Sequence, residues 1–398
     1  MTTHTPDDGA PLSIAAAMDL AVDLARSGPL VDPNPRVGAV LLDTAGRLLG
    51  SGYHRGSGTP HAEVAALADV ASRGRSAVGS TAVVTLEPCA HTGRTGPCVD
   101  ALVHAGVARV VFAEIDPGRG SGGGVGVLRA AGVETSRWPH EAAAALNPYW
   151  RHAIVTGRSW VTWKLAATLD GRVAAADGTS QWITSPEARA DVHALRAACG
   201  AVLTGTGTAL ADDPQLTVRA VATAGAQAAG GGHPSAQPLR VVLGQRDLPA
   251  DARLRDDAAP TLQIRSRDPR EALAAIHERG VRRVLLECGP TLAAAFLRAG
   301  LVDEIVAYLA PALLGSGAAV VTDLGIGTIA DIARFEVHAL RRVGPDVRID
   351  VRVPCHLKSG EPARDPTDPV REPPSEFALP ADPAVDLPTH HPAVPQEK

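Results

Sequence analysis

The chain has 398 residues, a length that predicts two to three domains of roughly 150 residues each. It is 45% hydrophobic with a formal net charge of −5, so it can bury a large core but has no excess of positive charge to hold a nucleic acid. The apolar stretch 305–322 is interrupted by Pro311 and glycines, which predicts strand, loop and strand rather than a membrane span. The N-terminus lacks a secretory signal and the five cysteines form no disulfide framework, so we expect a cytoplasmic protein.

Helix-like and strand-like segments alternate over about the first 133 residues, which predicts an α/β layer with a largely parallel sheet. The predicted helices span residues 13–26, 61–72, 98–105, 125–131 and 139–146. The predicted strands span residues 37–42, 48–53, 82–86 and 110–114, with a short strand near Val133. Residues 151–158 are expected to form the junction to a second block.

The second alternating block begins at Trp160 and shows no repeat of the first, so we expect two different α/β domains. Its predicted strands span residues 161–166, 201–204, 240–243, 283–287, 304–309, 335–341 and 347–353, and its predicted helices span residues 186–198, 269–278 and 290–298. The Ala- and Gly-rich stretch 220–237 is expected to be a mobile surface loop. Residues 354–398 hold 11 of the 32 prolines and have almost no apolar periodicity, which predicts a disordered tail.

The strongest chemical signal is the motif His61-Ala62-Glu63, followed by Pro88-Cys89 and Cys98. In nucleobase deaminases one histidine and two thiolates bind Zn²⁺, and the fourth tetrahedral position holds a water molecule. The metal lowers the pKa of that water to about 7, and a glutamate that is not a ligand carries the proton to the departing amine. His61 and Glu63 lie at the start of one predicted helix. Cys89 and Cys98 bracket the loop that leads into the next helix, whose N-terminal dipole favours thiolates. The sequence therefore predicts zinc bound by His61, Cys89 and Cys98, with Glu63 as the proton shuttle.

Two other functions stay open on these residues. One is a deaminase of free cytidine or tRNA with an inactive or unrelated second domain, which the acidic balance and the scarcity of lysine disfavour. The other is a non-catalytic scaffold, in which a further ligand would close the zinc site.

The spacing of the two cysteines is informative, because Cys89 and Cys98 are separated by eight residues instead of the two found in most of these enzymes.

This insertion, read with its neighbours, points to a family. The segments that carry the resemblance are Pro33-Asn34-Pro35-Arg36-Val37-Gly38, Gly52-Tyr53-His54, Pro60-His61-Ala62-Glu63 and the whole stretch 86–98. They closely resemble the bifunctional deaminase/reductase family of riboflavin biosynthesis, and the resemblance extends to about residue 353. It implies a cytidine-deaminase-like three-layer α/β domain (1–157) and a dihydrofolate-reductase-like α/β domain (158–353), followed by the disordered tail (354–398).

The resemblance also implies cofactors, partners and reactions. The cofactors are Zn²⁺ and NADPH, and the partners are small phosphorylated pyrimidines rather than nucleic acid or membrane; a homo-oligomer is expected as well. The first reaction deaminates 2,5-diamino-6-(ribosylamino)pyrimidin-4(3H)-one 5′-phosphate. The second reduces the ribosyl group of 5-amino-6-(5-phosphoribosylamino)uracil to ribityl.

In the deaminase half, the resemblance implies contacts with the pyrimidine or its ribose phosphate. The residues concerned are Asn34, His54, His91 and Arg94. Position 94 is usually lysine in this family, and arginine keeps the charge while changing its reach and geometry.

Lysine is rare in this chain, which makes Lys164 conspicuous. Of the 38 basic residues only Lys164, Lys358 and Lys398 are lysines, and the last two lie in the predicted tail. Either chance left one lysine in the globular part, or a compact ammonium is needed where a planar guanidinium would not fit.

The second block also has features of a ligand-binding α/β sheet. Strand 283–287 ends on Glu287 and leads into Gly289-Pro290-Thr291 at a helix start, where free N–H groups can hold a phosphate. Ser185 and Pro186 predict the N-cap and first position of another helix.

By the resemblance, these features belong to the reductase half, with Lys164 as the catalytic residue at the reacting sugar. Substrate contacts are implied for Ser180, Arg196, Leu216, Arg219 and Glu287. NADPH contacts are implied for Ala166, Trp182, Thr208, Asp212, Gly289, Pro290 and Thr291.

Overall fold

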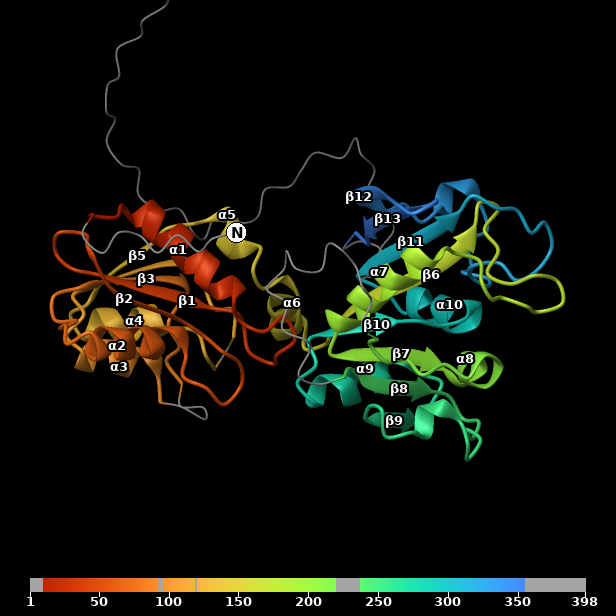
Figure 1. Ribbon diagram of the computed structural model, residues 1–398, viewed down its shortest axis with the longest axis horizontal. Coiled ribbons are helices and arrows are strands. Elements are labelled where there is room, and N and C mark those ends of the chain that lie inside the picture. Colours follow the sequence, from red (N-terminus) through yellow and green to blue (C-terminus); the bar gives the residue numbers. More distant parts are fainter. Residues whose placement is uncertain (1–9, 92–95, 119, 220–236, 355–398) are drawn as a thin grey trace, which may run out of the picture. The chain divides into compact units, whose positions relative to one another are not determined.

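The structure is a computed structural model that describes residues 10–91, 96–118, 120–219 and 237–354. Residues 220–236 of the predicted surface loop, residues 355–398 of the predicted tail, and Arg94 lie outside the described residues. Two α/β domains follow one another along the chain, each built on its own sheet (Figure 1).

The first domain has a five-stranded mixed sheet with the strand order β2-β1-β3-β4-β5. Its strands are β1 (Gly38–Leu42), β2 (Leu48–Tyr53), β3 (Thr81–Leu86), β4 (Arg109–Glu114) and β5 (Glu134–Arg137). Strand β1 runs antiparallel to β2 and β3, whereas β3, β4 and β5 are parallel. The prediction of a largely parallel sheet is therefore right only for the half of this sheet that contains β3, β4 and β5.

Helices cover both faces of this sheet and give the domain its three layers. The helices are α1 (Ile14–Arg26), α2 (Ala62–Ser72), α3 (Cys98–His104), α4 (Gly124–Ala130), α5 (Glu141–Ala144) and α6 (Pro148–Thr156). Alternate residues of β1 enter two cores, because successive strand side chains point to opposite faces. Ala39 and Leu41 pack with α2, α3 and α4, while Val40 and Leu42 pack with α1 and α5.

Close packing of α2 on β2 fixes the start of this helix. A Cβ atom at Gly52 would lie 2.5 Å from the backbone nitrogen of Ala66, so only glycine lets the helix approach so closely. The N-terminus of α2 carries His61 as its N-cap and Glu63 in its first turn. Packing in this layer thus determines where the residues of the predicted zinc site lie.

The second domain has an eight-stranded sheet with the order β12-β13-β11-β6-β10-β7-β8-β9. Its strands are β6 (Trp160–Thr168), β7 (Ala201–Gly205), β8 (Leu239–Leu243), β9 (Thr261–Ile264), β10 (Arg283–Leu286), β11 (Glu304–Ala310), β12 (Glu336–Val343) and β13 (Asp346–Arg352). The run from β11 to β9 is parallel, and the β12–β13 hairpin adds to it antiparallel. The sheet of the second domain is therefore largely parallel, and the expectation of a second, different α/β domain is confirmed.

Helices also pack on both faces of the second sheet. They are α7 (Pro186–Ala197), α8 (Thr206–Asp212), α9 (Pro269–Glu278) and α10 (Pro290–Arg298), with short 3₁₀ turns at Arg253–Arg255 and Ile329–Asp331. Val241 and Leu243 of β8 pack with α9 and α10, while Val242 faces the core beneath α7. Among the described residues, no helix is both long and apolar enough to cross a membrane.

The structure differs from the local predictions in four places. Residues 151–156 of the expected junction belong to α6, whose signals are Pro148 at its first position and Gly157 with positive φ at its end, so residues 157–159 alone link this helix to β6. Helix α8 and the four-residue strand β9 were not predicted, because Thr-Gly-Thr is a poor helix former and β9 is too short to show alternation. The second strand expected within 305–322 is absent from the described residues there, where Ala319 makes only an isolated bridge to Arg172.

Candidate functional site

Three side chains of the first domain form a cluster suited to a metal ion. One ligand atom each from His61, Cys89 and Cys98 lies within 4.8 Å of the others. His61 Nδ1 is 3.2 Å from Cys98 Sγ and 3.5 Å from Cys89 Sγ. Zn²⁺ binds nitrogen at about 2.0 Å and thiolate at about 2.3 Å, so ligand atoms this close can converge on one tetrahedral ion. The donor set therefore fits zinc and leaves the fourth position for water.

Local structure explains why these residues meet. His61 is the N-cap of α2 and Cys98 is the first residue of α3, so two helix N-termini point toward the cluster. Their dipoles favour negative charge on the sulfur atoms. The pKa of Cys89 is lowered, chiefly by the thiol of Cys98 and further by His61, and the proton of the second thiol is released on metal binding.

Removing one thiolate tests this cluster directly. We expect the variant Cys98→Ser to retain less than about a tenth of an equivalent of zinc, compared with about one in the wild type, because a hydroxyl is a poor zinc ligand. Cys199→Ser is the matched control, since Cys199 is also buried but lies outside the cluster. The measurement is metal analysis of the purified full chain, and full zinc content in Cys98→Ser would contradict the assignment.

Glu63 lies beside the cluster and is only 4% exposed. Burial raises the pKa of its carboxyl group, which suits a group that takes up a proton and releases it again. It is a residue of the first turn of α2, two positions after His61. The structure thus brings together all four residues that the motif analysis selected for this centre.

A cavity of about 610 Å³ opens onto this cluster. Asn34, His54 and His91 line it together with Glu63. His54 Nδ1 lies 3.1 Å from the carbonyl oxygen of Pro60, which can only accept a hydrogen bond, so the neutral ring carries its proton there. Its Nε2 then accepts from the Asn34 amide, 3.2 Å away.

The sequence reasoning missed two acidic residues near this cavity. Glu87 is buried and accepts hydrogen bonds from the backbone N–H groups of Asp116 and Val125, which ties the loop after β4 and the start of α4 to the cavity wall. Asp116 itself lines the cavity, and burial raises its pKa. Glu87 stands in the quoted motif directly before Pro88, so its position could have been noticed, whereas Asp116 carries no comparable signal.

A second, larger cavity of about 1410 Å³ lies in the second domain. All the residues that the resemblance implied for the reductase half line it, and these are Lys164, Ala166, Ser180, Trp182, Arg196, Thr208, Asp212, Leu216, Arg219, Glu287, Gly289, Pro290 and Thr291. Lys164 comes from β6 and Glu287 follows the adjacent strand β10. Ligands of open α/β sheets bind at the carboxyl ends of such parallel strands.

Comparison with known proteins decides the family. Residues 13–114 match the model of the cytidine and deoxycytidylate deaminase zinc-binding region, and residues 159–349 match the RibD C-terminal domain. The riboflavin biosynthesis protein RibD of Mycobacterium tuberculosis (strain ATCC 25618 / H37Rv) is 46% identical over 342 residues, which cover 85% of this chain and 97% of that protein. The chain belongs to the RibD family.

Solved structures agree with this result. Acinetobacter baumannii RibD, form 1, matches with a TM-score of 0.74 at 37% identity, covering 85% of this chain and 98% of that one. The diaminohydroxyphosphoribosylaminopyrimidine deaminase/5-amino-6-(5-phosphoribosylamino)uracil reductase from Thermotoga maritima matches with a TM-score of 0.72 at 29% identity, covering 85% and 98%. As a member of the RibD family, the chain is a bifunctional deaminase and reductase of riboflavin biosynthesis that uses zinc and NADPH.

The cavity of the second domain contains a bidentate ion pair between Arg196 and Glu287. Arg196 donates from Nε to Glu287 at 2.5 Å and from Nη2 at 2.9 Å, and its Nη1 donates to the carbonyl oxygen of Thr217 at 3.0 Å. Burial opposes ionisation of Glu287, but Arg196 and Lys164 together lower its pKa to about 2. Burial lowers the pKa of Lys164. Arg196 and Glu287 therefore stay charged at neutral pH.

Because of this ion pair, the free energy of unfolding depends on pH. The carboxyl of Glu287 ionises at about 2 in the folded chain against an ordinary value of 4.5, so its stabilisation is complete above about pH 4.5 and is lost as the pH falls through 2. We expect Glu287→Gln to lower the free energy of unfolding by about 3 kcal/mol at pH 7 and by much less at pH 2.5. Urea unfolding at both pH values measures this, and equal losses at the two would contradict it.

The start of α10 is arranged for an anion. Gly289 is its N-cap, and the N–H of Gly289 donates to Thr208 Oγ1 at 3.1 Å, which joins this turn to α8. Thr291 and Leu292 follow Pro290 in the first turn, where backbone N–H groups have no partner within the helix, and both residues line the cavity.

Sequence reasoning also missed His193 in this cavity. Its Nδ1 accepts the backbone N–H of Arg219 at 3.3 Å, and burial together with Arg196 and Arg219 lowers its pKa. His193 is therefore neutral at pH 7, and it holds the backbone N–H of Arg219, a predicted substrate residue. It lies three positions before Arg196 on α7, so helical spacing was a usable signal.

Proposed function

We propose that the chain catalyses two consecutive steps on one phosphorylated pyrimidine. The first converts 2,5-diamino-6-(ribosylamino)pyrimidin-4(3H)-one 5′-phosphate and water into the corresponding uracil and ammonia. The second reduces the ribosyl group of 5-amino-6-(5-phosphoribosylamino)uracil to ribityl, with NADPH as hydride donor. The convergence of His61, Cys89 and Cys98 beside the buried Glu63, in one chain with the second cavity, carries this proposal.

In the deaminase half, zinc held by the three ligands would supply a water molecule activated at neutral pH. Glu63 takes the proton from this water and passes it to the departing amino group, which leaves as ammonia. Asn34 and His54, locked to each other by their hydrogen bond, orient the pyrimidine, and His91 contacts it from the cavity wall. Arg94 is proposed to hold the phosphate, although it lies outside the described residues.

In the reductase half, NADPH when bound would supply the hydride. Lys164 donates a proton or hydrogen bond at the sugar while C1′ is reduced, and the negative charges of Glu287 and Asp212 favour its ammonium form. Ser180, Arg196, Leu216, Arg219 and Glu287 face the substrate and its phosphate. Ala166, Trp182, Thr208, Asp212 and the turn of residues 289–291 face the dinucleotide.

The domain limits, oligomeric state and location belong to the same proposal. The boundary is placed at residue 157, between α6 and β6, where Gly157 ends the helix. A homo-oligomer is supported by exposed apolar side chains on β12, an edge strand of the sheet, where Val337 and Leu340 are both about two-thirds exposed. Thiolate zinc ligands suit a reducing compartment such as the cytoplasm.

Assays of the two half-reactions test the proposed function. The purified chain is supplied with the diaminopyrimidine phosphate alone, and ammonia is measured; it is then supplied with the uracil phosphate and NADPH, and absorbance of NADPH is followed. We expect turnover in both assays and about one zinc per chain. Bound zinc with no turnover of either substrate would overturn the proposal.

A further inference from the structure

The second cavity depends on the short loop of residues 213–219, which leads from α8 toward β8 and carries two of the proposed substrate residues. Leu216 and Arg219 line the cavity, and Leu216 adopts a positive φ of 52° that is unfavourable for a residue with a side chain. Asp213 at the start of this loop also has a positive φ, of 39°. A loop in this conformation persists only where its surroundings hold it.

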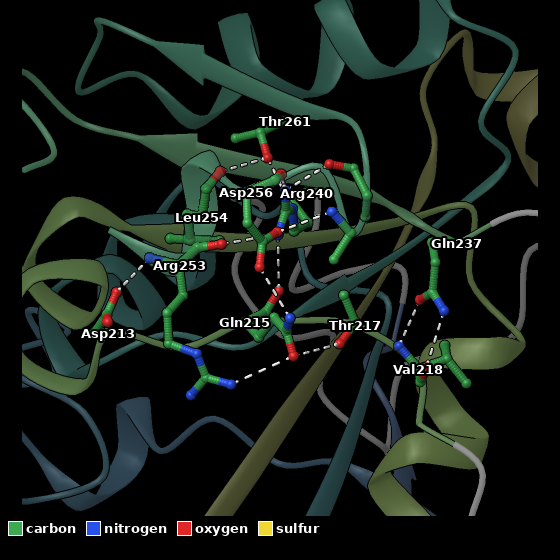
Figure 2. A network of polar contacts seen from close by, with 12 residues as sticks. Asp213, Gln215, Thr217, Val218, Gln237, Arg240, Arg253, Leu254, Asp256 and Thr261 are labelled. Atoms are coloured by element: carbon green, nitrogen blue, oxygen red, sulfur yellow. Dashed lines mark hydrogen bonds and ion pairs between the residues drawn. The ribbon is translucent and has the colours of Figure 1, made fainter. Parts of the chain in front are cut away.

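One restraint comes from Arg240 on β8, whose side chain is fully buried on the face of the sheet that packs beneath α7. Its guanidinium donates to the carbonyl oxygens of Gln215, Arg253, Asp256 and Ala259, to the carboxylate of Asp256 and to the hydroxyl of Thr261 (Figure 2). An apolar side chain of similar size would remove all these hydrogen bonds and would leave the carbonyl oxygen of the buried Ala259 without this donor.

The same network reaches the side chain of Gln215 (Figure 2). The Gln215 amide donates to Asp256 at 2.9 Å, and its oxygen accepts from Thr217 Oγ1 at 3.3 Å. Arg240 and Asp256 therefore hold Gln215 on one side of Leu216, and Gln215 in turn holds Thr217 on the other side.

A second restraint comes from Gln237, which lies just before β8 and is half-buried. Its side-chain oxygen accepts the backbone N–H of Val218 at 2.7 Å, and its amide donates to the Val218 carbonyl oxygen at 2.9 Å (Figure 2). The glutamine thus pairs with Val218 as a neighbouring strand would. Neither Gln237 nor Arg240 lines the cavity.

We propose that Gln237 and Arg240 are positioning residues, which hold residues 215–218 so that Leu216 and Arg219 meet the ribosylaminopyrimidine phosphate. This inference rests on the proposed reductase function. Gln237 acts on the backbone next to Arg219, and Arg240 acts through Gln215 and Asp256 on the backbone next to Leu216. We expect both residues to affect binding of the pyrimidine and not binding of NADPH. The proposed NADPH contacts come from β6, α8, the turn at residues 289–291 and Trp182, and none comes from residues 213–219.

The decisive variant is Gln237→Leu, which keeps the size of a half-buried side chain and removes both hydrogen bonds to Val218. We expect the KM of the reductase for the pyrimidine substrate to rise about tenfold, while the KM for NADPH and the deaminase turnover of the same chain stay within twofold of wild type. Gln263→Leu is the matched control, because Gln263 on β9 also donates to a backbone carbonyl, that of Arg246, outside this loop. It should leave the KM for the pyrimidine unchanged.

Arg240→Lys is the second variant, since it keeps the charge beside Asp256 but has too few donors for all the carbonyl oxygens. The same selective rise in KM is expected, with a lower melting temperature. An unchanged KM for the pyrimidine in Gln237→Leu, or an equal rise in both KM values, would overturn the inference while the wild type remains active. A wild-type chain without reductase turnover would instead overturn the proposed function on which it rests.

Discussion

Replacing Glu63 by glutamine is expected to lower deaminase kcat by about two to four orders of magnitude. Glutamine is nearly isosteric with glutamate but cannot carry a proton between the activated water and the departing amine, and such transfer contributes about 10² to 10⁴ in rate. Since Glu63 is not one of the three converging ligands, zinc content should stay at about one per chain. Ammonia release and metal analysis on the same preparation measure both quantities.

Two comparisons make this result specific. The reductase turnover of Glu63→Gln should equal that of the wild type, because the second cavity is built from other residues. Glu141→Gln is the matched control: Glu141 is also in the first turn of a helix of the same domain, but it is exposed. Full deaminase activity in Glu63→Gln, or loss of zinc along with activity, would show that Glu63 is not the proton carrier.

Replacing Lys164 by methionine is expected to lower reductase kcat by about two to three orders of magnitude. Methionine fills the same space without a charge, so the reacting sugar loses its proton or hydrogen-bond donor. Burial lowers the pKa of Lys164 below the ordinary 10.5, so in the wild type the donor form is lost, and the rate falls, at a lower pH than for a free lysine. The pH profile of NADPH oxidation measures this, and the alkaline fall should be missing in the variant.

The conservative change Lys164→Arg separates charge from geometry. A guanidinium keeps the charge but is planar and larger, so we expect this variant to stay at least tenfold below wild type. Deaminase turnover serves as the internal control for a folded chain. Wild-type reductase rates in Lys164→Met would contradict a catalytic role.

Much of the zinc centre was predictable from sequence because His61, Glu63 and Cys98 lie at helix starts, which local patterns mark well. The prediction that the helix begins at or next to His61 is confirmed, with His61 as the N-cap of α2, and Cys98 opens α3 as expected. The same holds for Glu287, since the end of a buried strand and the glycine turn after it are both visible in the sequence. The chemical roles of these residues stay predictions, which the variants above test.

Long-range polar packing was not predictable. Arg240 stands in a short strand, where an arginine normally faces solvent, and its burial depends on carbonyl groups of residues 253–259 that no periodicity reveals. Asp116 lines its cavity for a similar reason, because it contacts Glu87, which is remote in sequence. Helix α8 was not predicted from the sequence, because Thr206 and Gly207 have weak helix propensity and tertiary packing overrides it.

The most direct test of the whole account supplies one chain with the diaminopyrimidine phosphate and NADPH together, and measures ammonia and oxidised NADPH over time. If both steps occur in sequence, ammonia should appear first, and the two totals should converge on one NADPH oxidised for each ammonia released. NADPH oxidation that proceeds without ammonia, or ammonia that accumulates with no NADPH oxidised, would contradict the account.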